Sequence, residues 1–281
     1  MRELGVGTCQ IPTVPGDIGK NLEMLEQSIE AIKVSSPWVR LVCAHELCIQ
    51  GTPDMEGMAQ QIPGDIIESC ARIARRKEIY LIPGSLYERK DGRIYNTAPV
   101  IDPQGKLIAL YRKLYPWLPG EKTTPGDNTL VFDIPEVGRL GLCICYDLWF
   151  PEVIRDLVWK GSEAVFIPTS TSTPDRSQEL VLTQASAIAN QCYVVSVNGT
   201  GRGGIGQSLI VDPEGTIVQQ TGQEPENMAA KLDFAHVRNV REKGTCGVSR
   251  PLASYFHEQH RFDHQKRNYA ESPLWGLRKI L

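Results

Sequence analysis

The chain has 281 residues, of which 41% are hydrophobic and 22% are charged, a composition that is ordinary for a globular protein. Its 30 Lys and Arg residues nearly balance 33 Asp and Glu residues, so nothing favours nucleic acid or an anionic membrane as a partner. No apolar stretch approaches the roughly 18 residues of a membrane span, and the N-terminus lacks the apolar core of a signal peptide. The eight cysteines form no CxxC pair and lie mostly in apolar runs, which indicates reduced thiols in a cytoplasmic protein.

Strand-like and helix-like segments alternate through the first half of the chain. A strand is expected near Leu4–Ile11, and Asp17 can cap a helix whose apolar residues recur at steps of three and four. Trp38–Ala44 is predicted to be a buried strand, and Asp65 can cap a second helix. Three further strands are expected, near Ile79–Leu86, Ile94–Ile101 and Lys106–Arg112.

The second half continues the alternation, and together the halves predict an α/β protein. An apolar strand, Leu140–Cys145, precedes a helix that begins at Pro151, and Gly161 takes the position that follows a helix end. The remaining predicted elements are the strand Glu163–Pro168, the helix Gln178–Asn190 and the strands Tyr193–Val197, Ser208–Val211 and Thr216–Gln220.

One sequence pattern occurs twice, as Val100–Ile108 and Ile210–Val218. Each copy has a strand, an Asp-Pro-x-Gly turn and a second strand, and each follows an apolar run that begins with a tyrosine, Tyr80 or Tyr193. Two unrelated hairpins are the alternative, but the match favours an internal pseudo-duplication with two sheets face to face and helices outside. No linker divides residues 1–281, so one domain is expected, and its polar, aromatic tail from about residue 244 is expected at a subunit interface.

Cys145 lies between an apolar strand and a helix, the arrangement that holds a nucleophile beside backbone N–H groups able to bind an oxyanion. A thiol nucleophile needs a base, because free cysteine is mostly neutral at pH 7. His45 and Glu46 both end a strand, but neighbours in a strand point to opposite faces, so at most one can serve. We favour Glu46, because partial burial raises the pKa of a carboxyl and makes it a competent general base.

Lys113 ends a third strand among aromatic and proline neighbours. It can be a surface lysine, but a buried ammonium beside Cys145 would favour the thiolate and stabilise an oxyanion. Glu46, Lys113 and Cys145 therefore each lie at a strand end, where ligands bind in α/β proteins.

Five sequence segments follow one another in a distinctive order: His45–Leu47, Tyr111–Lys113, Cys145–Asp147 with Phe150–Glu152, Ala189–Val194 and Gly206–Gly215. Together they resemble the nitrilase superfamily, the carbon–nitrogen hydrolases with a Glu–Lys–Cys triad, over residues 4 to about 232. The resemblance implies that Glu46 is the general base, Lys113 the oxyanion stabiliser and Cys145 the nucleophile. It also implies that Glu121 is the second glutamate, which helps to position the substrate, and that the fold is an αββα sandwich that dimerises.

Two segments depart from the family pattern. Cys145-Tyr-Asp147 replaces the Cys-Trp-Glu of true nitrilases and resembles the amidase-like branches. Ser186–Asn190 lacks two charges that family members often carry, which places a supporting ion pair or an oligomer contact in question but not the triad.

The sequence thus predicts an enzyme that cleaves the C–N bond of a small carboxamide through a thioester on Cys145 and releases ammonia and an acid. The oxyanion is expected at Lys113 and the N–H of Tyr146, and the pocket walls at Trp117, Tyr146, Thr169 and Ser170. No metal or cofactor is implied, and a homodimer or larger even-numbered oligomer is expected. The alternatives are an N-carbamoyl hydrolase, a nitrile hydrolase and, in another class, a non-catalytic binding subunit.

Two other patterns are weaker. Gly201–Gly206 matches GxGxxG, but a strand rather than a helix is expected next, and a dinucleotide site needs the N-terminus of a helix for the pyrophosphate. His257, His260 and His264 have helical spacing that could chelate a metal, but no cysteine or carboxylate completes a familiar metal signature.

Overall fold

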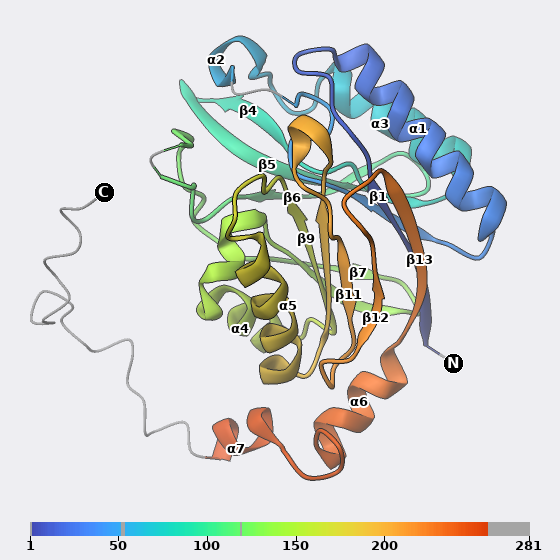
Figure 1. Ribbon diagram of the computed structural model, residues 1–281, viewed down its shortest axis with the longest axis vertical. Coiled ribbons are helices and arrows are strands. Elements are labelled where there is room, and N and C mark those ends of the chain that lie inside the picture. Colours follow the sequence, from blue (N-terminus) through green and yellow to red (C-terminus); the bar gives the residue numbers. More distant parts are fainter. Residues whose placement is uncertain (1, 52–53, 119, 258–281) are drawn as a thin grey trace, which may run out of the picture.

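A computed structural model of the chain describes residues 2–51, 54–118 and 120–257. Two β-sheets stack face to face, with α1 and α3 against one outer face and α4 and α5 against the other (Figure 1). This arrangement confirms the expected αββα sandwich. Within the described ranges, no helix combines the length and apolarity that a membrane crossing requires.

The first sheet has the strand order β13-β1-β2-β3-β5, and β4 and β6 both pair with β5. β1, β2 and β3 are parallel, whereas β13 and the strands after β3 pair antiparallel. Its strands are β1 (Glu3–Gln10), β2 (Leu41–Ala44), β3 (Tyr80–Ile82), β4 (Leu86–Lys90), β5 (Arg93–Ile101), β6 (Leu107–Arg112) and β13 (Glu226–Asp233).

The second sheet has the order β12-β11-β10-β9-β8-β7, with β8, β9 and β10 parallel and the other pairs antiparallel. The carboxyl ends of its parallel strands lead into the loops of the site described below. Its strands are β7 (Leu130–Ile134), β8 (Gly138–Leu142), β9 (Ala164–Thr169), β10 (Tyr193–Asn198), β11 (Leu209–Val211) and β12 (Ile217–Gln220).

The described helices cover the sheets and the lower end of the molecule in Figure 1. Asp17 caps the first of them as predicted, because its carboxylate accepts the N–H of Lys20 at 2.9 Å. The helices are α1 (Ile18–Ser35), α2 (Met55–Met58), α3 (Asp65–Lys77), α4 (Pro151–Trp159), α5 (Arg176–Asn190), α6 (Phe234–Lys243) and α7 (Pro251–His257), with short 3₁₀ helices η1 (Cys145–Trp149) and η2 (Gly201–Gly203).

The alternation of side chains along β2 places it between two apolar cores. Leu41 and Cys43 lie in the core between the sheets, and Val42 and Ala44 lie in the core beneath α1 and α3. Every residue of the strand is buried, so its sequence is uniformly apolar. The chain emerges from this strand at His45, and the site begins there.

The two repeated segments form matching hairpins, β5–β6 and β11–β12, which confirms that prediction. In the first turn the Asp102 N–H donates to the carbonyl of Lys106 at 2.9 Å, and its carboxylate accepts the N–H of Lys106 at 2.8 Å. Asp212 makes the same two bonds with Thr216, both at 2.9 Å. The pairing register of each hairpin also shifts at the equivalent place, one residue before its turn aspartate.

The match extends beyond the hairpins. The neighbouring strands β1-β2-β3-β5-β6 of one sheet correspond in order and direction to β8-β9-β10-β11-β12 of the other. Tyr80 and Tyr193 open equivalent strands. The N–H of Tyr80 donates to the backbone carbonyl of Arg40 at 2.8 Å, and that of Tyr193 to the backbone carbonyl of Glu163 at 3.0 Å; each acceptor lies just before the neighbouring parallel strand. The strand order of the two sheets therefore shows the internal pseudo-duplication.

Several predicted elements differ from the structure in their details. Trp38 lies outside β2, which begins at Leu41. Asp65 is the first residue of α3 rather than its cap, because Gly64 occupies the cap position and supplies no side-chain bond. The predicted strand Ile79–Leu86 is broken at Gly84, which has φ +88° and passes so close to β2 that a Cβ would collide with the carbonyl oxygen of His45.

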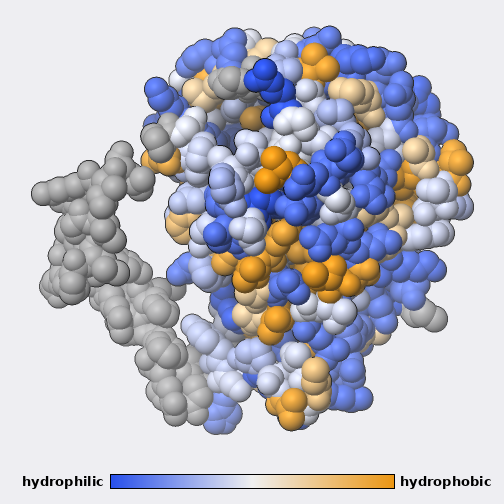
Figure 2. Space-filling view, viewed as in Figure 1, coloured by the Kyte–Doolittle hydropathy of each residue, from blue (hydrophilic) through white to orange (hydrophobic). Residues whose placement is uncertain are grey.

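Apolar side chains gather on the outer surface over α5 and β12 (Figure 2). We call this the apolar patch; it consists of Val181 and Ile188 on α5 and Ile217 and Val218 on β12. The described beginning of the tail packs on its own chain, where α7 contacts α5 and Tyr255 lies 5.1 Å from Trp159 between ring centroids. His260, His264 and the rest of the tail lie outside the described residues.

Candidate active site

The chain turns sharply at Cys145. β8 ends at Leu142, three residues before the predicted end, and Cys145 then adopts φ +48° at the start of η1. This left-handed conformation is uncommon for a residue with a Cβ, and it holds the thiol out from the end of the strand. η1 leads directly into α4 at Pro151. The strand, bend and helix predicted around Cys145 are therefore present.

Asp147 stabilises this turn from beneath. Its carboxylate accepts the N–H of Ile144 at 2.9 Å, the hydroxyl of Tyr111 at 2.6 Å and the N–H of Tyr115 at 2.9 Å. Burial raises the pKa of Asp147 to about 6, although these three donors act in the opposite direction. The Asp147 carboxylate thus ties the bend that carries Cys145 to β6 and to the segment after it.

Glu46 and Lys113 form a buried ion pair at the ends of β2 and β6. Lys113 Nζ donates to Glu46 Oε1 at 2.9 Å, and the two side chains are only 2% and 6% exposed. The Glu46 N–H donates to the carbonyl of Thr169 at 3.1 Å, so the backbone of the second sheet helps to place this carboxylate. A buried cation requires such partners, because desolvation alone would disfavour its charge.

Glu121 and Asn96 complete the cluster. Lys113 Nζ also donates to Glu121 Oε2 at 2.7 Å, and the amide nitrogen of Asn96 donates to Glu46 Oε1 at 2.8 Å and to Glu121 Oε1 at 2.9 Å. The hydroxyl of Thr123 is a further donor to Glu121, at 2.9 Å. Asn96 was missed by the sequence reasoning, although a buried amide in the middle of an apolar strand is an available signal, since Asn is depleted from strands.

The charges in this cluster support one another. Burial disfavours the ammonium of Lys113, but Glu46, Cys145 and Glu121 outweigh it and raise the pKa of Lys113, which stays cationic. Burial also acts to raise the pKa of Glu121, but the charge and hydrogen bond of Lys113 outweigh this and lower it. One cation is therefore shared between two carboxylates next to the thiol.

Burial is the largest influence on the thiol and raises the pKa of Cys145 well above its ordinary value. The charges of Glu46 and Glu179 act in the same direction, while Lys113 lowers the pKa. The resting group is therefore a neutral thiol, and its attack on a carbonyl requires a base that removes the proton during the reaction.

Glu46, Lys113, Glu121 and Cys145 line a cavity of about 510 Å³, a size suited to a small ligand. Of the predicted pocket walls, Trp117, Tyr146 and Ser170 line it. Thr169 is not among its lining residues: it is fully buried, and its hydroxyl donates to the carbonyl of Val197 at 3.2 Å. Thr169 instead contributes through its backbone carbonyl, which holds Glu46.

His45 has turned away from the cavity. Its Nδ1 lies 3.0 Å from the carbonyl oxygen of Glu46, and burial lowers the pKa of the ring to about 4, so the imidazole is neutral at pH 7. It packs against the glycines of the 199–203 loop. Gly201–Gly206 leads through η2 into the strand β11, and this course lacks the helix that a dinucleotide site requires.

The arrangement provides a thiol, a carboxylate able to accept its proton and a fixed cation able to bind an oxyanion.

A family model described as carbon–nitrogen hydrolase matches residues 5–242. A formamidase from Bacillus cereus (strain Q1) is 33% identical over 220 residues, which are 74% of this chain and 66% of the relative, so the match spans just under two thirds of that relative's length.

Two solved structures are similar in fold. Saccharomyces cerevisiae Nit3, a member of branch 10 of the nitrilase superfamily, has a TM-score of 0.82 and 26% identity over 93% of this chain and 97% of its own. A mutant of the amidase from Nesterenkonia sp. AN1 has a TM-score of 0.74 and 24% identity over 85% of this chain and 97% of its own. That amidase structure shows the result of Michael addition of acrylamide at the active-site cysteine.

Proposed function

The chain belongs to the carbon–nitrogen hydrolases of the nitrilase superfamily, and from that premise we propose that it hydrolyses a small carboxamide to ammonia and a carboxylic acid. The observation that carries this proposal is the ion-paired cluster of Glu46, Lys113 and Glu121 lining one cavity with the thiol of Cys145. Lys113 is fixed between the carboxylates, so its charge is preorganised for the transition state.

In the proposed reaction, Cys145 Sγ attacks the amide carbon while Glu46 accepts the thiol proton. The ammonium of Lys113 and the N–H of Tyr146 stabilise the negative charge that develops on the carbonyl oxygen. Glu46 then returns the proton to the departing nitrogen, and ammonia leaves as the thioester forms. A water molecule, deprotonated by Glu46, attacks the thioester, and the proton restores the thiol as the acid departs.

The names of the relatives support an amide as the substrate, since the curated relative is a formamidase and one structural neighbour is an amidase. N-carbamoyl compounds and nitriles are the other candidates, because the same thiol can attack both. An N-carbamoyl substrate yields ammonia, CO₂ and an amine, whereas a nitrile, like an amide, yields ammonia and an acid, so amide and nitrile hydrolysis are told apart by the substrate supplied. The complete cluster at the cavity argues against a non-catalytic binding subunit.

A panel of small amides, N-carbamoyl compounds and nitriles tests the proposal, with ammonia and the organic product both measured. We expect ammonia and the matching acid from amides, and an acyl adduct on Cys145 by intact mass spectrometry. Cys145→Ala should abolish turnover and the adduct, whereas Cys246→Ala, which removes the exposed thiol, should keep full activity. Turnover of amides by Cys145→Ala would refute the mechanism.

A cytoplasmic location forms part of the proposal. All eight cysteines lie within the described residues, and all are free thiols. Free, mostly buried thiols are typical of a reducing compartment.

A further inference from the structure

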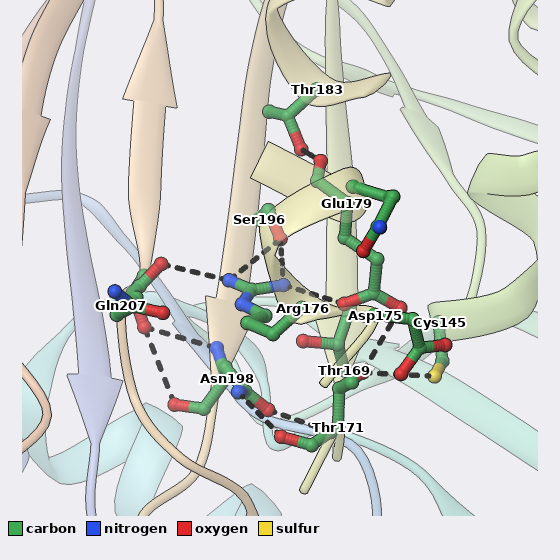
Figure 3. Close-up of polar contacts among 12 residues, drawn as sticks. Cys145, Thr169, Thr171, Asp175, Arg176, Glu179, Thr183, Ser196, Asn198 and Gln207 are labelled. Carbon is green, nitrogen blue, oxygen red and sulfur yellow. Dashed lines mark hydrogen bonds and ion pairs between the residues drawn. The ribbon is translucent and has the colours of Figure 1, made fainter. Parts of the chain in front are cut away.

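A second series of hydrogen-bonded polar side chains, separate from the Glu–Lys–Cys cluster, reaches the thiol (Figure 3). Thr171 lies just after β9, is 6% exposed and lines the cavity. Its Oγ1 is 3.8 Å from Cys145 Sγ. The mechanism proposed above assigns no role to this hydroxyl, although it lies next to the reacting atom.

The hydroxyl proton of Thr171 is engaged in a hydrogen bond to another side chain. Oγ1 donates to Glu179 Oε1 at 3.0 Å, and Glu179 Oε2 accepts from Arg176 Nη1 at 2.9 Å. A hydroxyl has one proton and two lone pairs, and an ionised carboxylate can only accept. Because Glu179 takes the proton, Thr171 offers the cavity its lone pairs and acts there as an acceptor.

The direction of the hydrogen bond from Thr171 to Glu179 is fixed by buried contacts of Arg176. Arg176 is 1% exposed, and its Nη2 donates to the carbonyl of Gln207 at 2.8 Å. Arg176 pairs with Glu179, so the Glu179 carboxylate is not left as an uncompensated charge beside the thiol.

The backbone of Thr171 is held as firmly as its hydroxyl. Its N–H donates to Asn198 Oδ1 at 2.9 Å, and its carbonyl accepts from Asn198 Nδ2 at 3.0 Å (Figure 3). A side chain held at both its backbone and its hydroxyl loses little freedom when a ligand binds.

We infer that Thr171 Oγ1 accepts an N–H of the scissile amide and so selects acyl donors that carry an N–H over esters and nitriles, which carry none. The inference rests on the proposed amide hydrolysis and adds a specificity residue to it. Lys113 is a donor and suits the carbonyl oxygen, whereas Thr171 is an acceptor and suits the amide nitrogen. Glu179 and Arg176 act through Thr171 and are positioning residues.

The test compares propionamide, which has N–H groups, with methyl propionate, which has none and forms the same acyl-enzyme. In kcat/KM the shared hydrolysis of that thioester cancels. Thr171→Val should lower kcat/KM for propionamide about three- to tenfold more than for methyl propionate, the loss expected for one neutral hydrogen bond. Thr171→Ser keeps the hydroxyl and should retain the wild-type ratio. Both rates come from one preparation, so the ratio is independent of the folded fraction.

Equal losses on the amide and the ester, or no loss, would overturn the inference while leaving amide hydrolysis intact. Failure of the wild-type enzyme to hydrolyse any amide would instead refute the proposed function. A second measurement separates these outcomes, because it needs no turnover.

Cys145 is labelled with acrylamide or acrylonitrile and followed by intact mass. In both additions Sγ bonds to the β-carbon, and the thiol proton passes to the α-carbon. Only acrylamide offers an N–H, so Thr171→Val should lower the acrylamide-to-acrylonitrile rate ratio about threefold or more. An unchanged ratio in this experiment would count against the hydrogen bond whatever the enzyme hydrolyses.

Glu179→Gln tests the positioning role. A glutamine amide can donate to Thr171 and free the threonine proton to point elsewhere, so the propionamide-to-ester ratio should fall as it does in Thr171→Val. A glutamate with a merely structural role would lower both rates equally and leave the ratio unchanged.

Discussion

Lys113 can remain charged inside the protein because its two carboxylate partners are held in place, and Asn96 bonds both of them. One amide nitrogen bonds both Glu46 and Glu121, so the two carboxylates are kept apart and directed at the same ammonium. Asn96 is 1% exposed and also accepts the backbone N–H of Lys113 at 2.9 Å. It is therefore a positioning residue for both the base and the cation.

Asn96→Ala should lower kcat/KM for amide hydrolysis about ten- to a hundredfold, because hydrogen bonds to charged groups are each worth about 1.5–3 kcal/mol. Asn96→Asp should be worse, since it places a third carboxylate beside the other two. Steady-state kinetics measures the effect. Asn227 lies on the far strand β13 and accepts a hydrogen bond from the hydroxyl of Ser28 on α1, so Asn227→Ala is the matched control and should keep normal kinetics. Near-normal activity in Asn96→Ala would show that the carboxylates position themselves.

At the scale of elements, the ion pair between Glu88 and Arg112 links β4, β5 and β6. Glu88 on β4 accepts two bonds from Arg112 on β6, both at 2.7 Å, and one from Thr97 on the intervening β5 at 2.8 Å. Burial acts to raise the pKa of Glu88, but these bonds outweigh it and lower the pKa below the ordinary 4.5. Because Lys113 follows β6 directly, this pair also fixes the strand that delivers the cation.

Glu88→Gln should lower the free energy of unfolding at pH 7 by about 1–3 kcal/mol, since it breaks a largely buried charged pair. A carboxyl whose pKa is lower in the folded state stabilises above its unfolded pKa, and this contribution disappears as pH falls through the folded value. The difference between wild type and variant should therefore shrink below about pH 4.5 in urea titrations. Glu56→Gln removes the exposed pair with Arg89 on the same strand and should cost about 0.5 kcal/mol or less. A pH-independent difference would rule out the linkage.

The sequence predicted the elements that stand on a local signal and missed those that depend on pairing. α4 was foreseen from its apolar spacing and the proline at its start, and the two hairpins from their turn residues. β13 was missed, because Glu226–Asp233 carries several exposed polar residues and becomes a strand by pairing along the length of β1. Asn96, Asp147 and Thr171 were missed as supporting groups for the same reason, since most of their partners come from distant parts of the chain that no local pattern identifies.

At the scale of the whole molecule, the apolar patch is the surface that the single chain leaves uncovered. Val181 is 64% exposed and Ile188 43%, although both lie on a helix that packs its other face on the second sheet. Contiguous exposed apolar side chains of this kind mark association surfaces. We propose that a second copy of the chain covers the patch, in keeping with the expected even-numbered oligomer.

Light scattering at micromolar concentration should give an even multiple of the 31.3 kDa chain mass. Val181→Lys should shift the mass towards that of one chain, because it places a charge in the proposed apolar contact. Val34→Lys is the matched control, since Val34 is 75% exposed on α1, away from the patch, and should leave the mass unchanged. A mass of 31.3 kDa for the wild type would contradict the oligomer.

The internal pseudo-duplication has a mechanical consequence for the chemistry. Glu46 and Lys113 follow strands of the first sheet, whereas Cys145 and Thr171 follow strands of the second. The base Glu46 and the thiol that it deprotonates therefore come from two different sheets. Interdigitated side chains such as Leu41 and Val165, together with cross-sheet hydrogen bonds such as that from the Glu46 N–H to the Thr169 carbonyl, hold the two sheets in place relative to one another. The apolar packing between the sheets therefore helps to set the distance from Glu46 to the thiol of Cys145, and a substitution that loosens it should misalign the reacting groups.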